Sequence, residues 1–193
     1  MVKTEIDVRP RRGNRFSHGL AAFMLRLFGW RVVGTLPNVP KMVIIGAPHT
    51  SNWDFPLSMA LMYYLGVPFN WMAKREFFKP PFSYLWLWLG GVPVDRKAAN
   101  GMVGDMVATV QQRSKIILAI APEGTRRKVD RWRTGFYHIA YQANIPIVPV
   151  LVDYGRKSLV VTEPFIPSGD VEADLPLLQD RYVGVKGKNH LQF

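Results

Sequence analysis

Two residues able to exchange a proton, His49 and Asp54, are separated by four positions and follow an apolar run. On one regular helix, five positions at about 100° each would place the two side chains about 140° apart. They can meet only if the chain turns between them, as a loop between a strand and a helix does. A carboxylate beside an imidazole fixes its tautomer and leaves the other ring nitrogen free to take a proton from a hydroxyl. The spacing is therefore typical of a general base with an orienting carboxylate.

A plainer role for Asp54 is open on the sequence alone. Asp54 lies just before Pro56, which suits the first turn of a helix, so its side chain is also a candidate helix N-cap. If the pair acts on a carbonyl, the negative charge that builds there needs hydrogen-bond donors. The backbone amides of Thr50 and Ser51, near the expected start of the helix, are candidates for that role.

A second group of polar residues, Glu123-Gly124-Thr125-Arg126, follows the apolar residues 116–121. A strand that ends in such a turn delivers a carboxylate, a hydroxyl and a guanidinium to the carboxyl edge of a sheet, where α/β sheets bind ligands. The planar arginine fork suits phosphate oxygens. The alternative is a solvated turn with a surface ion pair.

A third segment, residues 91–96, is another short apolar strand that ends in charge, at Asp95 and Arg96. Arg96 is a candidate phosphate ligand, and the alternative is an ion pair with Asp95 or contact with solvent alone.

Taken together, in their order along the chain, the three segments resemble the motifs of the PlsC-like glycerol-phosphate and lysophosphatidic acid acyltransferase family. The family pattern has a His-x4-Asp block, a strand ending in arginine, a Pro-Glu-Gly-Thr-Arg block and a proline-bearing apolar block. This chain matches it at residues 49–54, 91–96, 122–126 and 145–150, and residues 73–77 are similar to the family's basic-acidic segment. The Pro-Glu-Gly-Thr-Arg block departs from the pattern, since Ala121 precedes it where the family usually has an aromatic residue.

The resemblance implies a role for each matched residue. His49 would be the general base and Asp54 its orienting partner. The acceptor and its phosphate would be bound by Arg96, Glu123, Gly124, Thr125 and Arg126, with Lys74 as a further phosphate contact. No metal and no cofactor are expected, with acyl-CoA or acyl carrier protein as the acyl-donor substrate, and the resemblance implies that no covalent acyl-enzyme is required.

The implied activity is an O-acyltransferase that moves a fatty acyl group from acyl-CoA or acyl carrier protein to the hydroxyl of a lysophospholipid. Lysophosphatidic acid is the leading acceptor. Another lysolipid or a glycolipid hydroxyl is the alternative within this class.

Helical and strand patterns alternate along the chain, which predicts a single α/β domain with a largely parallel or mixed central sheet flanked by helices. Apolar runs predict the strands and amphipathic patterns the helices. The expected strands are 41–46, 70–73, 92–94, 115–121, 145–152 and 159–162, and the expected helices are 56–65, 80–89, 100–113, 134–143 and 175–182.

The N-terminal region divides into two parts ahead of these elements. Residues 1–15 are predicted to be a basic flexible arm, and residues 16–193 the acyltransferase domain. Within the domain, residues 16–30 carry Phe16, Phe23 and Trp30, with other apolar residues between them, at helical spacing. They predict an amphipathic helix that lies on a membrane surface or packs over the domain.

The bulk composition limits the classes of possible partner but does not identify one. The chain has 193 residues, a formal net charge of +11 and no cysteine, so disulfides and thiolate chemistry are excluded. Excess positive charge attracts nucleic acid, anionic membranes or phosphorylated substrates. No run of apolar residues reaches the length of a membrane span. We therefore expect peripheral or monotopic association with the cytoplasmic face of a membrane.

Three other functional classes fit the sequence less well. A basic nucleic-acid-binding module agrees with the charge, but no RNA- or DNA-binding signature is visible, so no nucleic-acid partner is expected. A serine hydrolase would use Ser51, but no Gly-x-Ser-x-Gly elbow surrounds it. A metal site is not expected either, because His18, His138 and His190 have no ligand spacing to His49.

Overall fold

The computed structural model describes residues 6–94 and 101–189, and the elements of this part of the chain alternate as the sequence predicts. In chain order they are α1 (Arg15–Leu27), β1 (Arg31–Val33), β2 (Lys41–Ala47), α2 (Asp54–Leu65), β3 (Asn70–Lys74), the 3-10 helix η1 (Arg75–Phe77), α3 (Ser83–Trp88), β4 (Gly91–Val94), α4 (Gly101–Gln112), β5 (Ile116–Ile120), α5 (Gly135–Gln142), β6 (Ile147–Asp153), β7 (Ser158–Val161) and α6 (Val171–Asp180).

Within the described residues, seven strands form one sheet in the order β1-β7-β6-β2-β5-β3-β4. Every neighbouring pair is parallel except β6 and β7, which are antiparallel. The sheet is therefore mixed, and the predicted α/β class is confirmed. The central strand β2 lies between β5 and β6, with Val43 opposite both Leu118 and Ile147.

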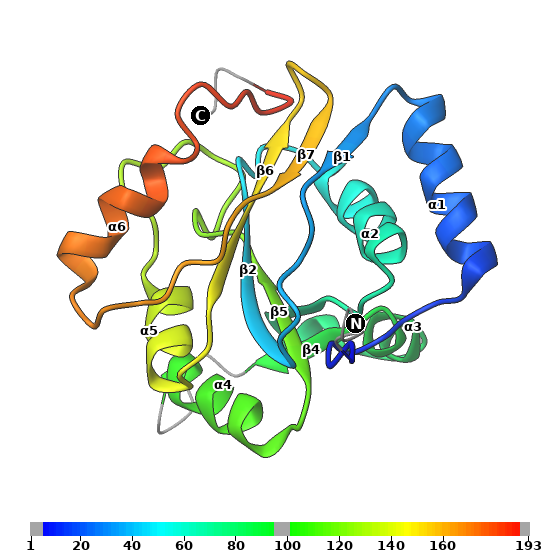
Figure 1. The fold of residues 1–193 in the computed structure, drawn as a ribbon. Helices are drawn as coiled ribbons and strands as arrows, with labels where there is room; N and C mark the ends of the chain where they lie inside the picture. Colours follow the sequence, from blue (N-terminus) through cyan, green and yellow to red (C-terminus); the bar gives the residue numbers. More distant parts are fainter. Residues whose placement is uncertain (1–5, 95–100, 190–193) are drawn as a thin grey trace, which may run out of the picture.

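Two apolar clusters, one on each face of the sheet, make up the core. Alternate residues of β2 face opposite sides, as the two-residue period of a strand requires. Val43 and Ile45 pack in the cluster that includes α4, α5 and α6, whereas Met42 and Ile44 pack in the cluster that includes α1 and α2. Figure 1 shows α5 and α6 on one side of the sheet and α1 and α2 on the other. The strand ends between these layers are thus held by packing on both faces.

Helix α1 begins at a capping box, in which Asn14 Oδ1 accepts the backbone N–H of Ser17 and Ser17 Oγ accepts that of Asn14. The helix ends earlier than expected, at Leu27, because the chain turns through Gly29 at φ +75°. Ala21 and Leu25 are buried. A wide apolar surface stays exposed, made of Phe16, Leu20, Phe23, Met24, Leu27 and Phe28.

The described part of the basic arm lies against the domain. The backbone N–H of Arg12 donates to Gly66 O at 2.8 Å, and its guanidinium donates to Trp88 O at 2.7 Å. The same guanidinium lies over the rings of Tyr63 and Trp88, at 5.5 and 4.9 Å from their centroids. The arm therefore links α2 to the end of α3. None of the helices in residues 6–94 and 101–189 is long and apolar enough to cross a membrane.

Candidate active site

The loop between β2 and α2 brings His49 and Asp54 together. Nδ1 of His49 lies 3.0 Å from Oδ2 of Asp54. The chain turns between the end of β2 at Ala47 and the start of α2 at Asp54, as the spacing of the two residues required. The carboxylate is buried, whereas 26% of the imidazole side chain is exposed. The ring is thus held on one side and accessible on another.

Asp54 is the first residue of α2 and not its N-cap, because Trp53 occupies that position. Its carboxylate bonds outside the helix. Oδ2 accepts the backbone N–H groups of Thr50 and Ser51, both at 2.9 Å, and Oδ1 accepts the hydroxyl of Tyr154 at 2.7 Å. The amides of Thr50 and Ser51 are therefore occupied by this carboxylate, and the expectation that they stabilise an oxyanion is wrong in this geometry.

These bonds determine the charge of Asp54. Burial opposes the charged form, but the hydrogen bonds from His49, Tyr154 and Ser51 together outweigh it and lower the pKa of Asp54 below its usual value. An ionised carboxylate only accepts hydrogen bonds. The proton of the neutral imidazole is then on Nδ1, and Nε2 is left as the proton acceptor.

Glu123 follows β5, and its carboxylate contacts the backbone of His49. Oε1 accepts the N–H of His49 at 2.9 Å. Oε2 is buried and has no hydrogen-bond partner among the described residues. Burial is the main cause that raises the pKa of Glu123, and the bond from His49 offsets only part of it. Glu123 thus leaves one acceptor oxygen unused beside His49.

Gly124 is required by the turn that follows Glu123. Its φ is +66°, and a Cβ at this position would lie 2.8 Å from Cδ and 2.9 Å from Nε of Arg133. Thr125 stabilises the turn itself, since its Oγ1 accepts the N–H of Arg127 at 3.3 Å. The hydroxyl of Thr125 is therefore used locally, within a turn whose shape depends on glycine.

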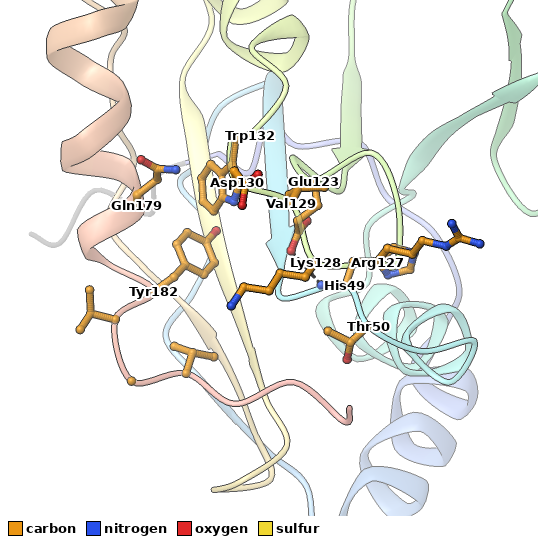
Figure 2. A pocket seen from close by; sticks show the side chains of 13 residues that line it. His49, Thr50, Glu123, Arg127, Lys128, Val129, Asp130, Trp132, Gln179 and Tyr182 are labelled. Atoms are coloured by element: carbon orange, nitrogen blue, oxygen red, sulfur yellow. Dashed lines mark hydrogen bonds between the residues drawn. The ribbon is translucent and has the colours of Figure 1, made fainter. Parts of the chain in front are cut away.

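A cavity of about 330 Å³ opens beside the pair, and Figure 2 shows the side chains around it. His49, Thr50 and Glu123 line one part. The rings of Trp132 and Tyr182 line the apolar part, at 5.2 Å between their centroids. The turn after β5 also contributes two cations, Arg127 and Lys128.

A second hollow of about 420 Å³ meets the first at Thr50, which lines both. It is mostly polar and contains Arg126. Its other lining residues are Ser51, Asn52, Trp53 and Asn189. An apolar cavity with a basic edge thus lies beside the imidazole of His49. A more open hollow, lined in part by Arg126, adjoins that cavity.

The structure brings some of the predicted site residues together and not others. His49, Asp54, Glu123 and Gly124 lie together, because β2 and β5 are parallel neighbours and end at the same edge of the sheet. Arg126 is in the adjoining hollow. Two predictions fall outside what the structure describes: Arg96 lies in the undescribed residues 95–100, and Lys74 ends β3 but its side chain is not described.

Two tyrosines at the site were not predicted from the sequence. Tyr154 contacts Asp54, and Tyr182 lines the cavity while its hydroxyl donates to Ile45 O at 2.8 Å. Neither belongs to a motif, and each is more than 90 residues from the His-Asp pair, so no local pattern points to them. Within the described residues, no group of three or more His, Cys, Asp or Glu side chains is placed to hold a metal ion.

Comparisons with known proteins identify a family model and related sequences that match this chain. Residues 31–153 match the family model described as Acyltransferase. The chain is 33% identical over 168 residues to a Mycoplasma pneumoniae protein named "Probable 1-acyl-sn-glycerol-3-phosphate acyltransferase", covering 80% of this chain and 61% of that one. It is 29% identical over 169 residues to 1-acyl-sn-glycerol-3-phosphate acyltransferase alpha of Bos taurus, covering 75% and 56%. The chain thus spans less than two thirds of these relatives.

The fold is similar to a solved structure. The crystal structure of the 1-acyl-sn-glycerophosphate (LPA) acyltransferase PlsC from Thermotoga maritima superposes with a TM-score of 0.59 at 21% sequence identity. The match covers 86% of this chain and 75% of that one, and it shows that the two share a fold.

Proposed function

The chain belongs to the acyltransferase family, and from that premise we propose that it transfers a fatty acyl group from a thioester to a lysophospholipid hydroxyl. Acyl-CoA or acyl carrier protein would be the donor. Lysophosphatidic acid is the acceptor we propose first, and the names of the relatives support this choice. The observation that carries the proposal is the 3.0 Å contact between His49 and Asp54 beside a cavity.

His49 would act as the general base. Its Nε2 accepts the proton of the acceptor hydroxyl while the hydroxyl oxygen forms a bond to the thioester carbonyl carbon. The carbon–sulfur bond then breaks, and the imidazolium returns the proton to the leaving thiolate. Asp54 keeps the ring in the required tautomer and stabilises the imidazolium. General-base catalysis of this kind supplies on the order of 10²–10⁴-fold.

The acceptor would be held from the side of the turn after β5. Among the described residues, Arg126 is the cation that lines the hollow meeting the cavity at Thr50, and it would bind the acceptor's phosphate. Arg96 and Lys74 remain predicted phosphate contacts. Glu123 Oε2, which lacks a partner among the described residues, would accept a hydrogen bond from a glycerol hydroxyl. No metal or cofactor is part of this proposal.

Association with the cytoplasmic face of a membrane would bring the lipid substrates to the site. Two exposed apolar surfaces support it: the surface of α1 already described, and the segment around α3, which exposes Phe82, Tyr84, Leu85, Leu87 and Trp88. Arg12, on the arm that leads into α1, contacts the end of α3. The net charge of +11 favours an anionic lipid surface.

A direct assay tests the proposed activity. Purified protein in detergent is incubated with labelled acyl-CoA or acyl carrier protein thioester and with lysophosphatidic acid, glycerol 3-phosphate or monoacylglycerol. We expect acylation of a phosphate-bearing acceptor and a loss of about 10²–10⁴-fold in His49→Ala. His138→Ala, on α5 and away from the cavity, is the matched control and should retain activity. Equal rates in wild type and His49→Ala would remove His49 from the mechanism.

A further inference from the structure

Tyr154 contacts the His-Asp pair from a distant part of the chain. It follows directly after β6, 100 positions from Asp54, and its hydroxyl donates to Asp54 Oδ1 at 2.7 Å. Burial, followed by this hydrogen bond, raises the pKa of Tyr154 well above its ordinary value, so the hydroxyl keeps its proton and acts as a donor. A hydrogen bond of this length to a charged carboxylate is of the strong kind.

The two oxygens of Asp54 are bonded unequally. Oδ2 receives three donors: Nδ1 of His49 and the backbone N–H groups of Thr50 and Ser51. Among the described residues, the hydroxyl of Tyr154 is the donor found at Oδ1. All three groups on Oδ2 come from the loop that carries His49. Tyr154 therefore ties the carboxylate to a different strand, and without it Oδ1 would be buried with no protein donor in the described part of the chain.

Tyr154 is itself held by two contacts. Its ring packs edge-on against Trp30, with 4.9 Å between the centroids and 89° between the planes. Its backbone N–H donates to Lys186 O at 2.8 Å. Trp30 follows α1 and its N–H donates to Leu25 O at 2.7 Å. A continuous set of contacts thus runs from α1 through Trp30 and Tyr154 to Asp54 and His49.

We propose that Tyr154 is a positioning residue for the His49–Asp54 pair, and that Trp30 holds it in place. This inference rests on the proposed function, because the pair must be catalytic for its orientation to matter. Tyr154 fixes the rotation of the carboxylate about its Cβ–Cγ bond and shares its negative charge. His49 then meets a carboxylate of one orientation and of moderated charge when it takes up the proton.

The first test is Tyr154→Phe, which removes the hydroxyl and keeps the ring that packs on Trp30. We expect kcat to fall roughly tenfold, as for the loss of a bond to a charged group, while the acceptor KM changes less than twofold. Without the tyrosine donor, more of the carboxylate's negative charge acts on His49, while the backbone N–H groups of Thr50 and Ser51 still donate to Oδ2. The acid limb of the kcat/KM profile should then move to higher pH.

Other titratable groups lie near the Asp54 carboxylate or on a segment that contacts Tyr154. His49 and Glu123 interact with it electrostatically, from the ends of β2 and β5, and Lys186 lies on the segment bonded to the backbone of Tyr154. All three are unchanged in Tyr154→Phe. A shift of the acid limb would therefore come from the missing hydroxyl.

A matched control is present in the same domain. The hydroxyl of Tyr137 on α5 donates to Asp174 Oδ2, also at 2.7 Å, in a buried site away from the cavity. Tyr137→Phe breaks the same type of bond, so a general loss of stability should appear in both variants. Only Tyr154→Phe should change kcat and the pH profile. Equal kinetic effects in the two variants would overturn the positioning role.

Trp30→Leu tests the second part of the proposal. We expect a smaller kcat loss in the same direction, and a double variant with Tyr154→Phe that is no worse than Tyr154→Phe alone, since both act through one hydroxyl. If the kcat losses of the two single variants multiply in the double variant, Trp30 does not act through Tyr154.

A measurement independent of turnover completes the test. The Nδ1 proton of His49 is followed by NMR on histidine-labelled protein, with His49→Gln used for assignment. Tyr154→Phe should shift this resonance and Tyr137→Phe should not, and an unmoved resonance would overturn the proposal. If wild type transfers no acyl group, the proposed function fails. If wild type is active, His49→Ala is inactive and Tyr154→Phe equals wild type, only the role of Tyr154 fails.

Discussion

The backbone N–H of His49 donates to Oε1 of Glu123 at 2.9 Å, so the loop after β2 and the turn after β5 are bonded to each other. The two segments are 74 positions apart in sequence. They meet because β2 and β5 are parallel neighbours, with Met42 opposite Ile117 and Ile45 opposite Ile120. The bond fixes the backbone of the imidazole residue and leaves Glu123 Oε2 in a buried position without a partner among the described residues.

Glu123→Gln is predicted to increase stability at neutral pH. Burial raises the pKa of Glu123 above its ordinary value of 4.5, so the folded state holds this proton more tightly than the unfolded state does. Between the two pKa values the unfolded chain binds fewer protons, and stability falls as pH rises. Glutamine has no charge to bury, and the variant should avoid this loss.

The measurement is thermal unfolding of wild type and Glu123→Gln at several pH values. Below pH 4.5 the two melting temperatures should differ least, and the advantage of the variant should grow as pH rises. Each kcal/mol corresponds to roughly 2–4 °C in a domain of this size. An advantage that is the same at all pH values would show that the buried charge is not its cause.

Gly124→Ala is predicted to damage the turn that carries Glu123. At φ +66° an alanine is strained, and its Cβ would also meet the side chain of Arg133 at 2.8 Å. A strained position of this kind costs about 1–3 kcal/mol. Gly19→Ala is the control, since Gly19 lies within α1 and has no atom within 4 Å of an added Cβ. Chemical denaturation should show a loss in Gly124→Ala and none in Gly19→Ala. Equal stabilities would show that the turn tolerates a side chain.

The sequence predicted the class of fold and the central part of the site for a physical reason. Apolar runs such as β2 and β5 are bounded by polar residues, so their ends, and the polar residues that follow, can be located from the pattern. The strand β1 was missed because it has three residues, begins with Arg31 and lies at the edge of the sheet. Strand order and the antiparallel β6–β7 pair depend on packing between distant segments, which periodicity does not encode.

The contacts missed at the site have the same origin. Tyr154 reaches Asp54 because β6 is the other neighbour of β2, a fact of sheet order. Thr50 and Ser51 were expected to serve an oxyanion, but their amides point to Asp54 Oδ2. The motif located His49 and Asp54, whereas the direction of each backbone N–H depends on the loop's conformation.

Arg126→Ala is predicted to weaken binding of the acceptor more than that of the donor. Arg126 lines the hollow that meets the His49 cavity at Thr50, and a phosphate there would lose a charge-assisted bond. We expect the acceptor KM to rise about tenfold and the donor KM to change less than twofold. Arg113→Ala, at the exposed end of α4, removes an equal charge and should leave both values unchanged. Equal changes of the acceptor KM in the two variants would contradict a phosphate contact at Arg126.

In the proposed association with a membrane, the exposed surface of α1 is the part expected to enter the lipid interface. Phe23 and Leu27 are 58% and 63% exposed, and they lie four positions apart, on one face of the helix. Replacing both with serine removes apolar area that would enter the interface between headgroups and acyl chains, and binding strength scales with that area. The fraction bound to sedimented vesicles of phosphatidylglycerol and phosphatidylcholine should fall severalfold, while activity on a detergent-soluble acceptor should persist.

The control for this experiment is Ile166→Ser, because Ile166 is 69% exposed and belongs to the segment between β7 and α6. Figure 1 shows α6 on the opposite side of the sheet from α1. This substitution removes exposed apolar area outside the exposed residues of α1 and α3, and vesicle binding should stay at the wild-type level. Raising the salt concentration should weaken binding of all three proteins, since attraction to anionic lipid is screened. If the α1 double variant binds vesicles as wild type does, α1 is not the membrane-contacting element.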